Sequence, residues 1–260
     1  MNTDEANFSV MTLNLRFGLA ADGANGWQHR KKLLPHLFAL HPADFIACQE
    51  ANDFQVQDLT AILDGYHLIG LRRPAPSFWQ NNVIFAKKAW RIRDWEHFYL
   101  SRTPSIPSRR RDSRWPRQCT MGTFEKSCQR ITCINTHFDF EEPAQVFSAK
   151  LIRKRWQQRS NPLPAVLLGD FNAPMDSSHF RILSKQSVAH NGICLGFKSA
   201  FDRNPGGTYH GFTGEPGDDC IDWILHTDGI QVRNARIITD HVDGAYYSDH
   251  FPVVAEFRFI

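Results

Sequence analysis

Apolar and polar residues alternate in short runs along most of the chain, and polar turns separate these runs from a few stretches with helical spacing. A strand turns successive side chains to opposite faces, whereas a helix brings every third or fourth residue to one face. On this basis the sequence predicts strands at residues 8–15, 44–49, 66–71, 82–87, 118–125, 130–138, 164–170, 219–226, 230–239 and 251–259.

Helical spacing is confined to a few segments, and we expect helices at residues 27–40, 54–63, 142–158 and 177–184. Pro35 lies inside the first of them and should kink or shorten it, because proline lacks the amide hydrogen that a helix needs. Strands dominate, and helices fall between them only in some places. This pattern favours an α/β fold of the four-layer α-β-β-α type, a sandwich of two mixed β-sheets packed face to face.

Length and composition are those of one globular unit. The chain has 260 residues, 42% of them hydrophobic, and no linker or low-complexity tract divides it, so we expect a single domain over residues 1–260. The N-terminus shows no basic segment followed by an apolar stretch, and no apolar run approaches the roughly 20 residues of a membrane span. We therefore expect a soluble, cytoplasmic protein without a transmembrane segment.

The six cysteines, at positions 48, 119, 128, 133, 194 and 220, form no Cys-x-x-Cys motif. Several of them lie inside apolar strand-like runs, as buried reduced thiols do. A zinc or disulfide framework is therefore not expected.

Polar residues recur where the expected strands end or begin. In α/β folds ligand sites gather at one end of the sheet, so side chains from several strand ends can meet there. Each residue alone has a simple structural explanation, such as capping a turn or a helix. Taken together they suggest a site, because six separate strand ends supply carboxylates, amides and imidazoles: Asn14, Arg16, Glu50, Asn135, His137, Asp170, Asn172, Asp222, Asp249 and His250.

The chemistry of this set favours a hard divalent cation. Carboxylate and amide oxygens are the ligands that Mg²⁺ and Mn²⁺ prefer, and the set holds no thiolate and too few histidines for a zinc site. Its amides and histidines can donate hydrogen bonds to phosphate oxygens.

The motifs "TLNLR", "CQE", "NTHFD", "LGDFN", "IDWI" and "SDHFPV" occur here in the order and spacing of a known group of proteins. With them the chain resembles the endonuclease/exonuclease/phosphatase superfamily, which has the fold of pancreatic deoxyribonuclease, over residues 8–259. The stretches "GWQHR" and "TYHGFTG" are similar to the compact bacterial members and their deadenylase relatives. Arg16 stands where abasic-site endonucleases have aspartate, which argues against abasic-site repair.

The resemblance implies a hydrolase in which water attacks a P–O bond with the help of Mg²⁺ or Mn²⁺. Its metal ligands would be Asn14, Glu50 and Asp249. Asp170 would orient or deprotonate the attacking water, and Asn172 would hold that water and a phosphate oxygen. His250 would bond the phosphate oxygens or act as an acid or base, and Asp222 would fix its ring. His137 would donate a hydrogen bond to the phosphate.

The substrate is less constrained by the resemblance, because one fold serves many phosphate esters. Six arginines and one aspartate lie between residues 101 and 118, together with Trp115. Arginines bind phosphates and an indole ring can take the face of a base or a sugar, so we favour nucleic acid or a nucleotide. For the run of residues 109–111, a solvated surface loop explains the charge equally well.

Four residues are candidates for binding the phosphate or a second anionic group: Arg16, Arg30, Arg117 and His210. Arg16 and Arg30 could instead form buried ion pairs with Glu50 or Asp249. A small phosphomonoester or a phospholipid headgroup is the alternative substrate, and the stretch "PSFWQ" is the only candidate for a membrane-contacting segment. A non-catalytic binding module is less favoured, because every catalytic and metal position is intact.

Overall fold

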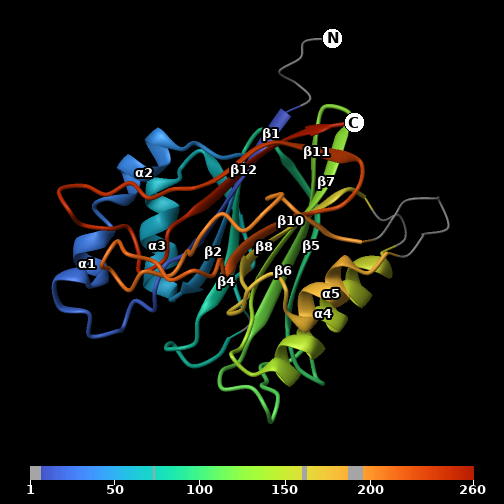
Figure 1. The fold of residues 1–260 in the computed structure, drawn as a ribbon, viewed down its shortest axis with the longest axis horizontal. Helices are drawn as coiled ribbons and strands as arrows, with labels where there is room; N and C mark the ends of the chain where they lie inside the picture. The colour runs from blue at the N-terminus through green and yellow to red at the C-terminus, as the bar shows by residue number, and fades with distance from the viewer. Residues whose placement is uncertain (1–6, 73, 160–162, 187–195) are drawn as a thin grey trace.

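The computed structural model describes residues 7–72, 74–159, 163–186 and 196–260, and Figure 1 shows their fold. Within these residues the strands form two six-stranded sheets. The first sheet has the order β11-β12-β1-β2-β4-β3. Its strands are β1 (Asn7–Asn14), β2 (Phe45–Ala51), β3 (Tyr66–Ile69), β4 (Asn81–Lys87), β11 (Ile230–Ile237) and β12 (Val253–Phe259).

The second sheet has the order β5-β6-β7-β8-β10-β9. In each sheet one neighbouring pair is parallel, β1 with β2 and β7 with β8, and the other pairs are antiparallel. Both sheets are therefore mixed. The strands of the second sheet are β5 (Arg91–Tyr99), β6 (Gln118–Lys126), β7 (Gln129–His137), β8 (Ala165–Asp170), β9 (Lys198–Ser199) and β10 (Asp222–His226).

The helices cover the outer faces of the two sheets, as Figure 1 shows. One hydrophobic cluster, which includes Phe45 and Phe124, lies between the sheets; two others pack the helices against them. The predicted four-layer sandwich is confirmed. The first sheet carries α1 (Trp27–Arg30), α2 (Leu34–Leu40) and α3 (Asp53–Ile62), and the second carries α4 (Glu142–Gln157) and α5 (Ser178–Ser184).

The structure differs from the sequence prediction in one helix and in two strands, β5 and β9. The helix predicted over residues 27–40 is two helices, because Pro35 stands in the first turn of α2, where its missing amide hydrogen leaves no bond unmade. Strand β5 was not predicted. It is an edge strand with charged residues at several exposed positions, so its sequence lacks the regular alternation that marks a half-buried strand.

The five cysteines within the described residues are free, and all but Cys128 are buried. Cys194 lies outside the described residues. Within the described part of the chain, no helix combines the length and the apolar character that a membrane crossing requires.

A buried histidine in the second helical layer makes the stability of the fold depend on pH. The ring of His179 stacks on Trp223 at 5.1 Å between centroids and is fully buried. Burial lowers the pKa of His179 to about 4. The unfolded chain therefore binds a proton here between pH 6.5 and 4 that the folded chain does not bind, so acid favours unfolding in this range.

We expect His179→Phe to reduce the loss of unfolding free energy between pH 7 and pH 4.5. A shift from 6.5 to about 4 corresponds to at most about 3 kcal/mol. Urea unfolding of the wild type and the variant at a series of pH values measures the difference. His36→Phe, at an exposed position on α2, is the control. Parallel pH profiles for the wild type and His179→Phe would contradict the expectation.

Candidate functional site

Three neighbouring strands of the second sheet present polar side chains in one row. In the pairing of β7 with β8, His137 lies opposite Asp170, and in the pairing of β8 with β10, Asp170 lies opposite Asp222. Strand β10 is antiparallel to β8, so the first residue of β10 lies beside the last residue of β8. The sheet register therefore brings together residues that are 33 to 85 positions apart in the sequence.

The row depends on a glycine just before Asp170. Gly169 has φ +148°, and a Cβ atom at this position would lie 1.9 Å from the carbonyl oxygen of Thr136. A side chain there would clash with the backbone of β7. Glycine thus permits the close approach of β7 and β8 that sets Asp170 beside His137.

His250 and Asp222 form a buried hydrogen-bonded pair. Asp222 Oδ2 lies 2.8 Å from His250 Nδ1, while His250 Nε2 points to the other side, 3.9 Å from Asp170 Oδ2. Burial alone would lower the pKa of His250, but the charges of Asp222, Asp170 and Asp249 raise this pKa to about 10. The ring is therefore a cation at neutral pH, with one N–H held by Asp222.

Asp170 is poised between its ionised and its protonated form. Burial and the negative charge of Asp222 raise the pKa of Asp170 to about 7. Asn14 Nδ2 donates to Asp170 Oδ2 at 2.9 Å, and the Asn172 amide donates to Asp170 Oδ1 at 2.9 Å. These two bonds fix the plane of the carboxyl group.

His137 completes the row as a neutral ring. Burial, followed by the charges of Arg117 and His250, holds the pKa of His137 well below its usual value. Its Nε2 atom lies 3.0 Å from Asn172 Nδ2 and 3.4 Å from Asp170 Oδ2. The structure therefore brings together all five residues that the sequence suggested as catalytic: His137, Asp170, Asn172, Asp222 and His250.

A second group of polar residues comes from the first sheet and meets this row. Asn14 ends β1 and lies opposite Gln49 in the parallel strand β2. The Asn14 side-chain amide donates to Glu50 Oε1 at 3.3 Å as well as to Asp170, so it joins the two groups. The backbone amide of Phe17 donates to Glu50 Oε2 at 2.7 Å.

The backbone is strained at three of these positions. Arg16, Glu50 and Asn172 have φ values of 60°, 59° and 50°, a backbone region that residues other than glycine seldom adopt. Such conformations persist where the surrounding structure enforces them, and they cluster at functional sites.

Two sets of side chains could hold a divalent cation. Asp170, Asp222 and His250 each offer a ligand atom, all within 4.8 Å of one another. Asn14, Glu50 and Asp249 offer amide and carboxylate oxygens. By donor type the second set suits Mg²⁺ or Mn²⁺, because these ions prefer oxygen. In this structure the Asn14 side-chain oxygen accepts from the backbone amide of Arg16 at 2.8 Å and the Asn14 nitrogen faces Glu50, so metal binding by this set stays a prediction.

The arginines suggested for phosphate binding occupy different environments. Arg16 is partly exposed, forms two hydrogen bonds of 3.0 Å with Asp22 and lies 3.6 Å from Asp249 Oδ2. Arg117 is buried, and its Nε donates to Asp139 Oδ2 at 3.3 Å. Both line the same cavity as Glu50.

Arg30 lies behind the site and is 2% exposed. Its guanidinium donates to the backbone carbonyls of Asn25, Leu15 and Tyr247 at 2.6, 3.0 and 2.8 Å. These bonds join the segment after Asn14 to the segment before Asp249. The buried Nη2 atom of Arg30 has no hydrogen-bond partner among the described residues, so phosphate binding by Arg30 stays a prediction.

His210 is also buried, and its ring stacks on Phe251 at 4.0 Å. The backbone amides of His210 and Gly211 donate to the carbonyl oxygen of Asp249 at 2.9 and 3.1 Å. Burial lowers the pKa of His210 to about 4, so the ring is neutral. His210 thus supports the segment that carries Asp249 rather than offering a charge to an anion.

Asp139 orders the loop of residues 113–115, a role that the sequence pattern did not predict. Its buried carboxylate accepts hydrogen bonds from the Ser113 hydroxyl and from the backbone amides of Arg114 and Trp115 at 2.8, 3.0 and 3.1 Å. Burial alone would raise the pKa of Asp139, but these bonds and Arg117 hold it below its usual value. The sequence feature that could have indicated this role is the place of Asp139 at the end of the motif "NTHFD".

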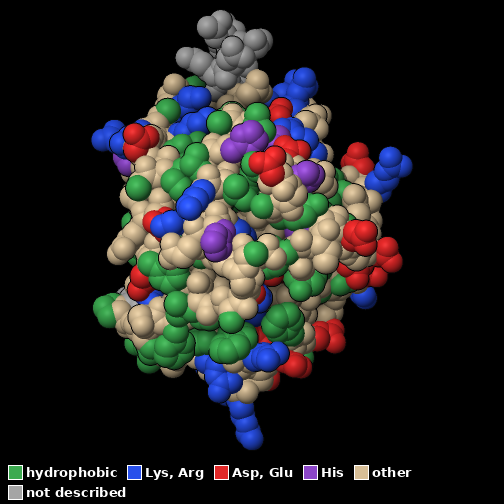
Figure 2. Space-filling view, turned by 90° about the vertical axis from the view of Figure 1, so that its left-hand side faces the viewer, with side chains coloured by type: hydrophobic (Ala, Val, Ile, Leu, Met, Phe, Trp, Pro, Cys, Tyr) green, Lys and Arg blue, Asp and Glu red, His purple; other side chains and the backbone are tan. Residues whose placement is uncertain are grey.

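A cavity of about 460 Å³ opens beside Glu50, and we call it the aromatic pocket. Figure 2 shows hydrophobic side chains gathered in the lower part of one face, with lysine and arginine side chains below them. Most of the wall of the aromatic pocket comes from residues 78–80, in the stretch "PSFWQ", and from residues 114–117, in the arginine-rich stretch. Its lining residues are Arg16, Phe17, Glu50, Phe78, Trp79, Gln80, Arg114, Trp115, Pro116, Arg117 and Phe140.

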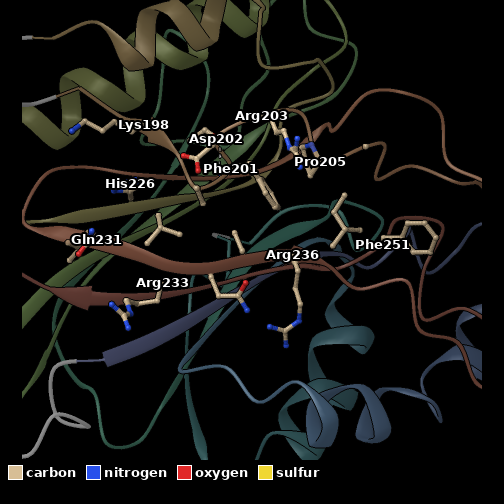
Figure 3. A pocket seen from close by; sticks show the side chains of 18 of the residues that line it. Lys198, Phe201, Asp202, Arg203, Pro205, His226, Gln231, Arg233, Arg236 and Phe251 are labelled. Carbon is tan, nitrogen blue, oxygen red and sulfur yellow. Dashed lines mark hydrogen bonds between the residues drawn. The ribbon is translucent and has the colours of Figure 1, made fainter.

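A larger hollow, of about 1390 Å³, lies elsewhere, along β9, β10 and β11. Figure 3 shows Arg203 and Asp202 on one side of it and Arg233 and Arg236 on the other. None of its described lining residues belongs to the row of β7, β8 and β10 or to the oxygen set. Size alone therefore does not mark the functional site.

Known proteins share the sequence pattern and the fold of this chain. The sequence model of the Endonuclease/Exonuclease/phosphatase family matches residues 11–250. A solved endonuclease/exonuclease/phosphatase from Bacteroides vulgatus is 27% identical, with a TM-score of 0.87 and coverage of 98% of this chain and 99% of that one. The mannosyl-6-phosphatase Bt3783 of Bacteroides thetaiotaomicron is also 27% identical, with a TM-score of 0.85 and coverage of 97% and 100%.

More distant structures share the fold. D. rerio TDP2, solved in complex with a single strand DNA product, is 13% identical, with a TM-score of 0.75 and coverage of 97% of this chain and 99% of that one. No curated protein sequence matches significantly. The family match spans nearly the whole chain and includes every residue of the site described above. The chain therefore belongs to the endonuclease/exonuclease/phosphatase family.

Proposed function

We propose that the protein hydrolyses phosphate esters by attack of water, with the help of Mg²⁺ or Mn²⁺. The observation that carries this proposal is the meeting of a buried row, His137, Asp170 and the Asp222–His250 pair, with the oxygen ligands of the first sheet. The row would supply a base and a cation, and the oxygen ligands would supply a metal site. Phosphoryl transfer requires these parts, because positioning and charge stabilisation supply most of its rate.

Asn14, Glu50 and Asp249 would hold the cation. When bound, it would neutralise charge on the phosphate and stabilise the leaving oxygen. The protein prepares this position with bonds that orient the ligands: Phe17 N to Glu50 and Ser248 Oγ to Asp249 Oδ1 at 3.1 Å.

Asp170 would accept the proton of the attacking water. A base works best when its pKa lies near the working pH, and that of Asp170 is about 7. Asn172, held by the carbonyl of Phe138 at 2.9 Å, would fix the water and one phosphate oxygen.

The protonated ring of His250 would donate its free N–H to a phosphate oxygen. Asp222 holds the opposite nitrogen, so the ring can neither rotate nor lose its charge easily near neutral pH. Neutral His137, and the arginines Arg16 and Arg117 on the pocket side, would complete the contacts to the phosphate.

We expect Glu50→Gln to abolish activation by metal at low concentrations. Hydrolysis of bis-nitrophenyl phosphate and of p-nitrophenyl phosphate, titrated with Mg²⁺ and with Mn²⁺, measures the effect for a diester and a monoester. The amide is a weaker ligand than the carboxylate, so the variant should need at least about tenfold more metal. Glu96→Gln on β5, where Glu96 pairs with Arg155, is the control. A wild-type metal titration for Glu50→Gln would overturn the metal assignment.

The proposed substrate class is nucleic acid or a nucleotide, because arginines and aromatic rings line the aromatic pocket beside Glu50. A small sugar phosphomonoester is the second candidate, since a 27% identical structure is a mannosyl-6-phosphatase. Rates on single-stranded DNA, RNA, nucleoside monophosphates and sugar phosphates separate the two. A polynucleotide rate that falls steeply with salt would support a nuclease.

A further inference from the structure

The aromatic pocket exposes rings that a folded protein would ordinarily bury. Phe78, Trp115 and Phe140 are 55%, 49% and 56% exposed, and all three line this one cavity. Exposed apolar groups gathered in a cavity are typical of ligand sites. Glu50 and Arg117 connect the cavity to the phosphate side of the site.

The pocket is formed before any ligand arrives. Asp139 holds the segment of Trp115 through backbone amides, and Gln118 Nε2 donates to the carbonyl of Gln80 at 2.8 Å. Trp79 packs edge-on against the buried ring of Tyr99 at 6.0 Å. Ordered walls reduce the entropy that is lost when a ligand binds.

The polar groups of the pocket are mostly donors. Arg16, Arg114, Arg117 and Gln80 present N–H groups, and among the described lining residues Glu50 is the one carboxylate. Nucleobases offer a flat face for stacking and ring nitrogens and carbonyls that accept from guanidinium groups. A free sugar would instead need several acceptors for its hydroxyl hydrogens, and among the described lining residues only Glu50 and Gln80 carry side-chain acceptors.

We propose that the aromatic pocket binds the nucleobase of a nucleotide while the phosphate lies against Asp170, His250 and Glu50. This inference rests on the proposed function of the site and assigns its substrate class. Trp115 and Phe140 supply the rings on which the base stacks. A guanidinium lies over each ring, Arg114 at 5.9 Å from the Trp115 centre and Arg117 at 5.7 Å from the Phe140 centre, so the base would stack on the opposite face.

Binding to the full-length Asp170→Asn protein tests the pocket without turnover. Isothermal titration with adenosine 5′-monophosphate, ribose 5-phosphate and mannose 6-phosphate compares ligands with and without a base. We expect adenosine monophosphate to bind at least about tenfold more tightly than either sugar phosphate. Adding Trp115→Ala or Phe140→Ala should weaken its binding by roughly 5- to 150-fold, as loss of one stacking ring does, and leave the sugar phosphates unchanged.

Trp95→Ala is the matched control, because Trp95 is an exposed tryptophan on β5 outside the pocket. Circular dichroism checks that each variant is folded. If Trp115→Ala does not fold, Phe140→Ala alone tests the stacking. Equal affinities for adenosine monophosphate and ribose 5-phosphate, or tighter binding of mannose 6-phosphate, would overturn the proposal. Base-selective binding by a wild-type protein that hydrolyses no phosphate ester would support the pocket and refute the proposed function.

Discussion

Replacing Asp170 with asparagine is expected to lower kcat by about 10²- to 10⁴-fold, the contribution of a positioned general base. Asparagine keeps the size of the side chain and can still accept the hydrogen bond from the Asn172 amide. It cannot accept a proton at neutral pH. Steady-state kinetics on bis-nitrophenyl phosphate at constant Mg²⁺ measures the effect, and KM should change much less than kcat.

The pH profile adds an independent test of the same role. In the wild type kcat/KM should rise with pH through about 7, as Asp170 loses its proton. This acidic limb should disappear in Asp170→Asn. Asp94→Asn, which changes an exposed carboxylate on β5, should keep it. A variant at position 170 with wild-type kcat would rule out Asp170 as the base.

Replacing Asp222 with asparagine is expected to have the second largest effect, a loss of roughly 10²- to 10³-fold in kcat/KM. This is the range found when one donor to a developing charge is lost. Asp222 raises the pKa of His250 and also that of Asp170. An amide at position 222 removes both influences while preserving the shape of the site.

Both limbs of the pH profile should therefore move to lower pH in Asp222→Asn. The acidic limb follows Asp170, whose ionised form becomes available at lower pH. The alkaline limb follows His250, whose cation is present below its pKa of about 10 and would be lost at lower pH once that pKa falls. NMR titration of the His250 ring in both proteins reports the pKa directly. An unshifted profile would mean that Asp222 acts only in packing.

Much of the fold could be predicted from local patterns. Strands such as β1 and β8 are buried along most of their length and bounded by polar turns, so their apolar runs match their observed bounds closely. Strand β5 was missed because Arg93, Asp94 and Glu96 interrupt its pattern and pair with side chains of other elements. Strand β9 has only two residues, too few for any periodicity.

The site was predictable where position along the chain determines position in space. Residues at strand ends, such as Asn14 and Asp170, meet because the sheets align those ends. Arg30 shows the limit of this reasoning, since two of the carbonyls that hold it, those of Leu15 and Tyr247, come from segments 15 and 217 residues away. The role of Asp139 likewise depends on a loop that precedes it by more than twenty residues.

The place of β12 in the first sheet determines when the molecule can begin to work. Strand β12 lies between β11 and β1, with Arg258 opposite Asn7 and Val253 opposite Thr12. On the ribosome β1 is made before the other described strands, and its antiparallel partner β12 is made after them. Asp249 and His250 lie a few residues before β12. A nascent chain therefore has a β1 edge that is open to wrong pairing, and it has no complete site, until β12 has left the ribosome.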